Sequence, residues 1–298
     1  MPTVLDYGDR PSKRVTRRIF VEALRRLQSI DRLSNYSYVG FGAYQFLDFD
    51  LVHRQLGIER MVSIESDADL IARCHFNVPY RAIDILEGTA TTLIPTLDWS
   101  GKSIVWLDYT QRLRSDEMAD CENVALRLQP GSVLAVTLNC HPGEDGQRRA
   151  ALAKSVGSEN VPIGITEARL GDWGLAKAQR ELLTSLIHRT LAGRGDGVNW
   201  QQLLNIHYRD DARMQMIVGI VDHPDLHEKI QGCRFEDMRE VSFDGHPIVV
   251  DLPVLTLREQ QAISKKLPSS RSLREFAGIS ARDVASYAEF YRWLDPVG

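Results

Sequence analysis

The sequence is poor in the features that mark secreted, metal-binding and disulfide-rich proteins. Its 298 residues include four cysteines, which are widely spaced at Cys74, Cys121, Cys140 and Cys233. Because no Cys-x-x-Cys pair is present, the sequence supports neither a zinc knuckle nor a disulfide framework. We therefore expect reduced cysteines, no metal site and a cytoplasmic protein.

Long apolar runs and a strong net charge are also missing. No stretch reaches the roughly 20 apolar residues that cross a bilayer, and the segment 1–14 has no apolar core of a secretory signal. The formal net charge is −4, so no general attraction to nucleic acid is expected. The sequence predicts a protein that does not enter membranes.

Positive charge is concentrated in the segment 13–30. Val15, Ile19, Ala23 and Leu27 recur every four residues, which predicts an amphipathic helix with five arginines on its remaining surface. Such a basic face can contact phosphate, but aromatic side chains for base stacking are sparse. A solvated face, or a docking face for a partner, is the favoured interpretation. Nucleic-acid binding through this helix remains an alternative.

Apolar runs alternate with helical periodicity between residues 36 and 139. Strands are predicted at Tyr36–Gly42, Arg60–Glu65, Tyr80–Leu86, Ser103–Tyr109 and Ser132–Asn139. Helices are predicted between them at Phe46–Leu56, Ala68–Phe76, Thr89–Leu97 and Asp116–Leu128. The fourth and fifth strands are nearly continuous apolar runs, as expected for strands buried on both faces. The alternation predicts an α/β fold with a parallel sheet between two helix layers.

This alternation stops after residue 140. Helices are predicted at Gln147–Val156 and Gly174–Leu191, and strands at Leu203–Arg209 and Arg213–Val221. The tight connection between the two strands predicts an antiparallel hairpin.

The last part of the chain carries two local signals. Asp244-Gly245 between short apolar runs predicts a second hairpin over Glu240–Asp251. Thr256 and Glu259 have the spacing of a capping box, which predicts a helix over Thr256–Leu267. We therefore divide the chain into an N-terminal helical unit (1–35), a core (36–222) and a C-terminal α+β extension (223–298).

A glycine-containing loop follows the first predicted strand. Gly40-Phe41-Gly42 comes directly after the apolar run, and Glu65 ends the next strand. Small residues let the backbone approach a ligand, and a carboxylate at the end of the second strand binds ribose hydroxyls. The third glycine of a dinucleotide fingerprint is missing, so a plain tight turn and a solvated Glu65 stay open as alternatives. The pattern favours a cofactor-type site.

Five parallel strands followed by an antiparallel hairpin resemble the class I S-adenosylmethionine-dependent methyltransferases. This resemblance implies a Rossmann-like sheet, mostly parallel, with an antiparallel terminal hairpin. Gly40 and Gly42 match the glycine loop of that superfamily, and Glu65 matches its acid on the second strand. Asp84, taken as the end of the third strand, matches the residue that contacts adenine. Asp108, at the end of the fourth, matches a group near the methyl donor or acceptor. The resemblance implies S-adenosylmethionine as cofactor, held by Gly40, Phe41, Gly42, Tyr44, Glu65 and Asp84.

The sequence departs from the superfamily at several positions. Tyr44 stands where most members have a third glycine, so its ring narrows the methionine pocket or stacks on the ligand. After the fifth strand Asn139 is present without the aspartate of a catechol-type metal site. His141 follows at the same edge of the sheet and titrates near neutrality, which makes it a second candidate for proton transfer beside Asp108; an inert loop histidine is the alternative.

The leading prediction is O-methyl transfer from S-adenosylmethionine to an unknown acceptor, with Asp108 and His141 as catalytic candidates. Several segments resemble bacterial O-methyltransferase-like proteins, some of them from mobile or antiviral-defence loci. A second reading is therefore a catalytically degenerate binding or scaffolding subunit of a defence complex. A third is an enzyme that uses another nucleotide, although the glycine-poor loop gives no pyrophosphate cradle for NAD. The acceptor, a protein partner and homo-oligomerisation all remain open.

Overall fold

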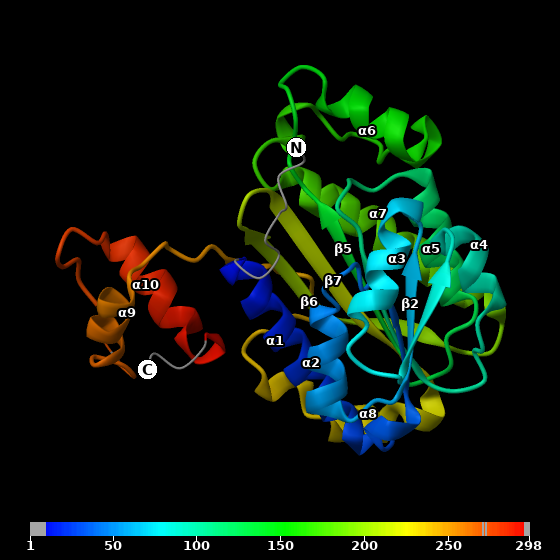
Figure 1. Ribbon diagram of the computed structural model, residues 1–298. Helices are drawn as coiled ribbons and strands as arrows, with labels where there is room; N and C mark the ends of the chain where they lie inside the picture. The colour runs from blue at the N-terminus through cyan, green and yellow to red at the C-terminus, as the bar shows by residue number, and fades with distance from the viewer. Residues whose placement is uncertain (1–9, 270, 272, 295–298) are drawn as a thin grey trace.

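The computed structural model describes residues 10–269, 271 and 273–294. In this part of the chain one mixed sheet is covered by helices on both faces (Figure 1). The strands are β1 (Ser37–Gly40), β2 (Arg60–Glu65), β3 (Ile83–Glu87), β4 (Ser103–Asp108), β5 (Val133–Asn139), β6 (Asn199–Arg209), β7 (Arg213–Asp222) and β8 (Ile248–Val250). The α-helices are α1 (Pro11–Arg25), α2 (Leu47–Leu56), α3 (Ala68–Asn77), α4 (Ala90–Leu93), α5 (Ser115–Ala125), α6 (Arg148–Val156), α7 (Gly174–Arg194), α8 (His227–Gly232), α9 (Leu257–Ser264) and α10 (Ala281–Phe290).

The order of the strands across the sheet is β3-β2-β1-β4-β5-β7-β6-β8. Every described strand except β7 runs in the same direction, and β7 lies antiparallel between β5 and β6. The predicted fold class, a Rossmann-like sheet with an antiparallel terminal hairpin, is confirmed. The chain leaves β1 toward β2 and β3 and then crosses back to β4, so the crevice of this fold lies at the carboxyl ends of β1 and β4.

Alternate residues of the central strands pack against different helix layers. In β4, Ile104 and Trp106 belong to the core under α1 and α2, whereas Val105 and Leu107 belong to the core under α5 and α7. All four side chains are buried. Strands buried on both faces account for the continuous apolar runs of the sequence.

Several predicted strands differ from the structure. The first ends at Gly40 and not at Gly42, and β6 begins at Asn199, four residues before the predicted Leu203. The third begins at Ile83 rather than Tyr80, since a turn after Pro79 occupies residues 81 and 82. The predicted hairpin over Glu240–Asp251 is wrong, because turns and bends precede β8 and β8 pairs in parallel with β6. The edge of β6 presents free backbone N–H and C=O groups, and this short apolar segment pairs with them.

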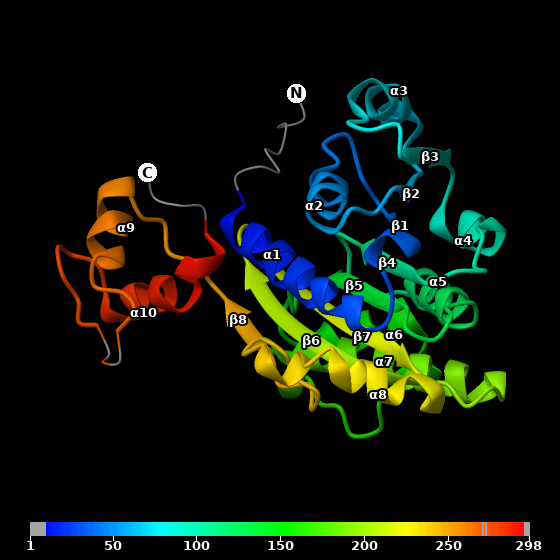
Figure 2. The same ribbon diagram turned by 90° about the horizontal axis from the view of Figure 1, so that it is seen from below.

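Helix α1 lies along one face of the sheet, beside α2 and β6 (Figure 2). Pro11 occupies its first turn, where a missing N–H costs nothing, and Val15 and Ile19 are buried. The predicted arginine face is only partly solvated, since Arg25 is exposed but Arg14, Arg17, Arg18 and Arg26 are half-buried. Arg18 donates to the carbonyl of Trp293 at 2.8 Å, as C-terminal segments cover this face.

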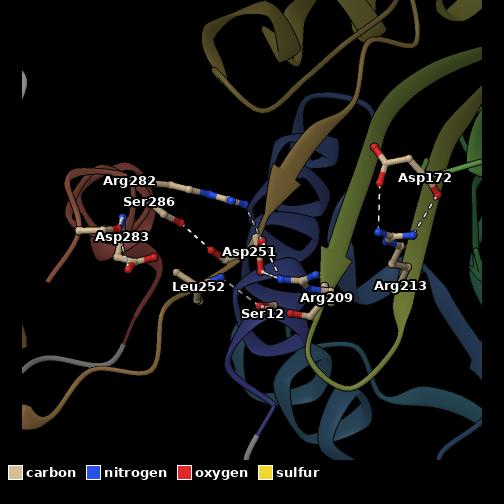
Figure 3. A network of polar contacts seen from close by, with 10 residues as sticks. Ser12, Asp172, Arg209, Arg213, Asp251, Leu252, Arg282, Asp283 and Ser286 are labelled. Carbon is tan, nitrogen blue, oxygen red and sulfur yellow. Dashed lines mark hydrogen bonds and ion pairs between the residues drawn. The ribbon is translucent and has the colours of Figure 1, made fainter. Parts of the chain in front are cut away.

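Helices α9 and α10 form a small unit at the left of Figure 1, with its own core of Ile263, Ile279, Val284 and Tyr287. The predicted capping box is present at the start of α9. Asp251 links this unit to the sheet: it pairs with Arg209 of β6 and Arg282 of α10, as the dashed lines of Figure 3 show.

Within the described residues no helix combines the length and apolar character that a membrane crossing requires. Residues 1–9 and 295–298 of the predicted terminal units lie outside the described part of the chain. The division at residues 35 and 222 stays a prediction.

Candidate functional site

The strands around β1 end at different heights. Gly40, the last residue of β1, is in register with Ser63 of β2 and Trp106 of β4. Both neighbours continue for two more residues, to Glu65 and Asp108. The loop after Gly40 therefore starts in a notch of the sheet edge, with one carboxylate on each flank.

Close packing shapes the glycine loop. The N–H of Gly42 donates to Ser63 Oγ at 3.0 Å, and Phe46, with φ 51°, turns the chain into α2. A Cβ on Gly42 would lie 2.5 Å from the Phe46 ring and 2.8 Å from Ser63 Oγ. Glycine at this position is therefore required by the Phe46 ring and by Ser63.

Tyr44 and Phe41 are partly buried in this loop. The guanidinium carbon of Arg73, on α3, lies 3.6 Å from the centre of the Tyr44 ring, a cation–π contact. The Phe41 ring packs edge-on against Tyr109, with ring centres 5.3 Å apart. One face of the tyrosine is therefore taken by Arg73. Contact of Tyr44 with a ligand stays a prediction.

Glu65 is half-buried at the carboxyl end of β2. Its Oε1 accepts a hydrogen bond from the N–H of Asp67 at 2.8 Å, and its Oε2 lies 3.9 Å from the thiol of Cys74. Burial, together with the charge of Glu65, raises the pKa of Cys74 to about 11, which keeps that thiol protonated. The backbone bond fixes the Glu65 carboxylate, and Oε2 can accept a ligand hydroxyl in addition to the weak thiol contact, because a carboxylate oxygen accepts more than one hydrogen bond.

The predicted position of Asp84 is wrong. It is the second residue of β3, level with Val62, and it lines a pocket at the amino end of the strands beside Arg60. The error lies in taking Asp84 as the strand end, since the observed strand continues for three more residues to Glu87. At the carboxyl end of β3 stands Glu87, opposite Glu65, and the sequence analysis missed it.

Asp108 pairs with a lysine from α1. Lys13 Nζ donates to Asp108 Oδ2 at 2.6 Å, and the two side chains are 7% and 17% exposed. The second carboxylate oxygen, Oδ1, is buried and has no hydrogen-bond partner. Asp108 is therefore held in place through one oxygen, while the other is left unsatisfied.

A second buried carboxylate lies on the same face of the sheet. Tyr38, on β1, donates its hydroxyl to Asp48 of α2 at 2.6 Å. Burial raises the pKa of Asp48, although the Tyr38 hydrogen bond and the charge of Arg17 oppose the rise. The sequence analysis missed these residues. The segment Phe46–Leu51 contains two aspartates, and nothing local distinguishes the buried Asp48 from Asp50.

His141 follows β5 at the predicted edge but is exposed. Its backbone N–H donates to Asn139 Oδ1 at 2.8 Å. The group that the structure brings to the Asp108 carboxylate is Lys13 and not His141. Proton transfer by His141 stays a prediction.

The sequence was compared with protein families. The family described as “Putative O-methyltransferase” matches residues 5–296. No curated protein matches the chain in sequence.

Several solved structures are similar to the chain at low sequence identity. The O-methyltransferase TomG from Streptomyces achromogenes, in complex with SAM, is 18% identical over 68% of this chain and 79% of its own, with a TM-score of 0.40. Trm1 from Pyrococcus horikoshii, with S-adenosyl-L-methionine, is 15% identical over 72% and 56%, with a TM-score of 0.48. An O-methyltransferase from Bacillus cereus, in complex with SAH, is 16% identical over 70% and 81%, with a TM-score of 0.40.

Proposed function

We propose that the protein transfers a methyl group from S-adenosylmethionine to an oxygen atom of its acceptor. The chain belongs to the family described as “Putative O-methyltransferase”, whose model matches residues 5–296. One observation carries this proposal. The backbone of Gly40–Gly42 starts two residues below the ends of β2 and β4, between the carboxylates of Glu65 and Asp108. An open α/β sheet binds its ligand at this point.

The residues present fit S-adenosylmethionine. Gly40 and Gly42 let the loop backbone pass close to the neighbouring strands, and Glu65 Oε2, which receives a weak thiol contact from Cys74 at 3.9 Å, can also accept hydrogen bonds from ribose hydroxyls. Phe41 and Tyr44 are the aromatic residues of the loop, and Glu87 adds a carboxylate beyond Glu65. When bound, the sulfonium supplies an activated methyl group.

The work left to the protein is to orient the acceptor and to receive its proton. Asp108 lies on the β4 side of the notch, opposite the Glu65 side, so its carboxylate faces the acceptor end of the site in this proposal. Holding the two reactants in line supplies much of the rate enhancement. His141 is a more distant candidate for the same proton.

Calorimetric titration with S-adenosylmethionine tests the proposal. Wild type should bind, and Glu65→Ala should weaken binding about 10-fold or more, since hydrogen bonds to a charged group contribute roughly 1.5–3 kcal/mol. Asp84→Asn is the matched control at the opposite edge and should bind like wild type. Equal binding by Glu65→Ala, or loss of binding in Asp84→Asn, would contradict the assignment.

A second candidate is a binding or scaffolding subunit that has kept the fold and lost catalysis. The observation that favours it is Tyr44 in the place of a glycine, held under Arg73. An antiviral-defence role and a stable protein partner belong to this candidate. It predicts no heat with S-adenosylmethionine and a partner that co-purifies in pull-downs.

A further inference from the structure

Two residues of the glycine loop have an unfavourable backbone conformation. The φ angles of Ala43 and Phe46 are 45° and 51°, in the left-handed region that residues with a Cβ seldom adopt. Such conformations persist only where the surrounding structure holds them. The loop starts in the notch that receives the cofactor in the proposed function, so the groups that hold the loop bear on cofactor binding.

Tyr109 supports the loop from the β4 side. It directly follows Asp108, the last residue of β4, and its ring packs edge-on against the ring of Phe41, with centres 5.3 Å apart. Tyr109 is buried, and its N–H donates to the carbonyl of Thr137, on β5, at 3.1 Å. The sheet therefore fixes the backbone of Tyr109, while its ring lies against the loop.

The Tyr109 hydroxyl is anchored outside the loop. It donates to Asp120 Oδ2, on α5, at 2.7 Å, and Thr91 Oγ1, on α4, donates to Asp120 Oδ1 at 2.7 Å. Burial raises the pKa of Tyr109, so its hydroxyl keeps its proton and can donate. Asp120 is buried, and both of its oxygens have a donor, as buried polar groups require. The tyrosine ring is thus held at its far end by two helices.

A second side-chain contact holds the loop from the β2 side. Arg73, on α3, lies over the ring of Tyr44. Arg73 is exposed, and a cation–π contact at an exposed site contributes less than a desolvated one. The buried Tyr109 is the stronger of these two supports.

We propose that Tyr109 is a positioning residue for cofactor binding: anchored on Asp120, it holds Phe41 and the glycine loop in the conformation that receives S-adenosylmethionine. The inference rests on the proposed function, because it concerns the same site. Tyr109 acts through Phe41, and Asp120 acts through Tyr109. A loop that is ordered before the ligand arrives loses less conformational entropy on binding, so loosening it weakens binding.

Hydrogen exchange of the ligand-free protein tests whether Tyr109 holds the loop. The N–H groups of Gly42 and Phe46 donate to Ser63 Oγ and to the carbonyl of Gly42, so their exchange rates report opening of the loop. Tyr109→Leu removes the ring and the hydroxyl. It should accelerate exchange over residues 40–46 severalfold and leave β6 unchanged. Tyr109→Phe keeps the ring and should have a smaller effect.

Calorimetric titration with S-adenosylhomocysteine tests the consequence for binding. Tyr109→Phe should weaken binding about 3- to 10-fold, the effect of one hydrogen bond, and Tyr109→Leu should weaken it further. Asp120→Leu leaves the tyrosine hydroxyl without its acceptor and should weaken binding at least as much as Tyr109→Phe. Asp120→Asn keeps an oxygen that accepts from Tyr109 and should restore most of the affinity.

Tyr36→Phe is the matched control. Tyr36 is also buried, and its hydroxyl donates to the carbonyl of Gly131 at the opposite edge of the sheet. The variant loses a buried tyrosine hydrogen bond without touching Phe41, so it should change neither the exchange of the loop nor the binding of S-adenosylhomocysteine.

The proposal is overturned if Tyr109→Leu binds S-adenosylhomocysteine like wild type, or if its loop exchanges at the wild-type rate. It is also overturned if Tyr36→Phe weakens binding as much as Tyr109→Phe. These outcomes differ from failure of the proposed function, in which wild type itself does not bind S-adenosylhomocysteine. Faster loop exchange in Tyr109→Leu would then leave Tyr109 as a support of the loop with no role in cofactor binding.

Discussion

At the scale of single residues, the candidate site depends on close packing around the glycine loop. Gly42 lies against the Phe46 ring and Ser63 Oγ. The Gly42→Ala variant should destabilise the protein by about 1–3 kcal/mol, the usual cost of overpacking, and abolish S-adenosylmethionine binding. Thermal unfolding and calorimetry measure both effects.

The control for this variant is Gly101→Ala, where a Cβ would meet nothing within 4 Å. It should change neither stability nor binding. Full cofactor binding by Gly42→Ala would show that the loop does not need its present conformation.

His207 should make the stability of the protein depend on pH. Its ring stacks on Trp173 with centres 4.5 Å apart, and burial lowers its pKa from 6.5 to about 4. Between these values the unfolded chain binds a proton that the folded chain does not. Stability should therefore fall as the pH drops from about 6.5 to 4, by about 3 kcal/mol at most.

His207→Phe should keep the ring stacking and flatten this part of the stability profile, measured by urea unfolding at several pH values. His246→Gln changes an exposed histidine and should keep the wild-type profile. An unchanged slope in His207→Phe would assign the pH dependence to other groups.

The sequence predicts some site residues and misses others for physical reasons. Gly40, Gly42, Glu65 and Asp108 follow from strand ends, because apolar runs stop there. Lys13 could not be identified, since its partner Asp108 is 95 positions away and nothing local distinguishes it from the neighbouring basic residues.

At the scale of elements, the start of α1 is held by the turn between β6 and β7, which is far from it in sequence. The N–H groups of Ser12 and Lys13 donate to the two oxygens of Asp210 at 2.9 and 3.0 Å. This arrangement satisfies free donors of the helix and places a negative charge at its positive end.

Asp210→Ala should therefore lower stability by about 1–2 kcal/mol, comparable to loss of a helix cap, as measured by urea unfolding. Asp211→Ala, at a largely exposed neighbour, is the control and should cost little. Equal effects of the two substitutions would mean that the cap contributes nothing specific.

Elements with a clear apolar pattern were predicted well, because the spacing of their apolar residues indicates which face is buried. β2 was predicted with its observed bounds, and α2 within one residue. The pairing of β8 was predicted wrongly, as part of a local hairpin. A three-residue apolar segment does not determine its own partner strand, and in the fold the available sheet edge is that of β6.

At the scale of the whole molecule, the C-terminal helices are joined to the sheet edge through Asp251. Besides its two arginine partners, the carbonyl of Asp251 accepts from Ser286 Oγ at 2.7 Å, and the N–H of Leu252 donates to Ser12 Oγ. Figure 3 shows these contacts converging between α10, β6 and α1.

Asp251→Ala should loosen α9 and α10 from the sheet while leaving the sheet intact. Hydrogen exchange should increase severalfold in α9 and α10 and stay unchanged in β4 and β5. Arg54→Gln, which removes an exposed pair with Asp50 inside the main body, is the control. If hydrogen exchange in α9 and α10 is the same in Asp251→Ala as in wild type, other contacts hold this unit to the sheet.

The Asp210 contacts join positions 198 residues apart, and this distance sets an order of events during synthesis. A growing chain that has emerged as far as β5 already contains the glycine loop, Glu65 and Asp108, but it has neither Tyr208 nor the turn that anchors α1. The start of α1 is thus fixed only after β6 and β7 have been made, and a ribosome-bound fragment would form the glycine-loop side of the sheet first.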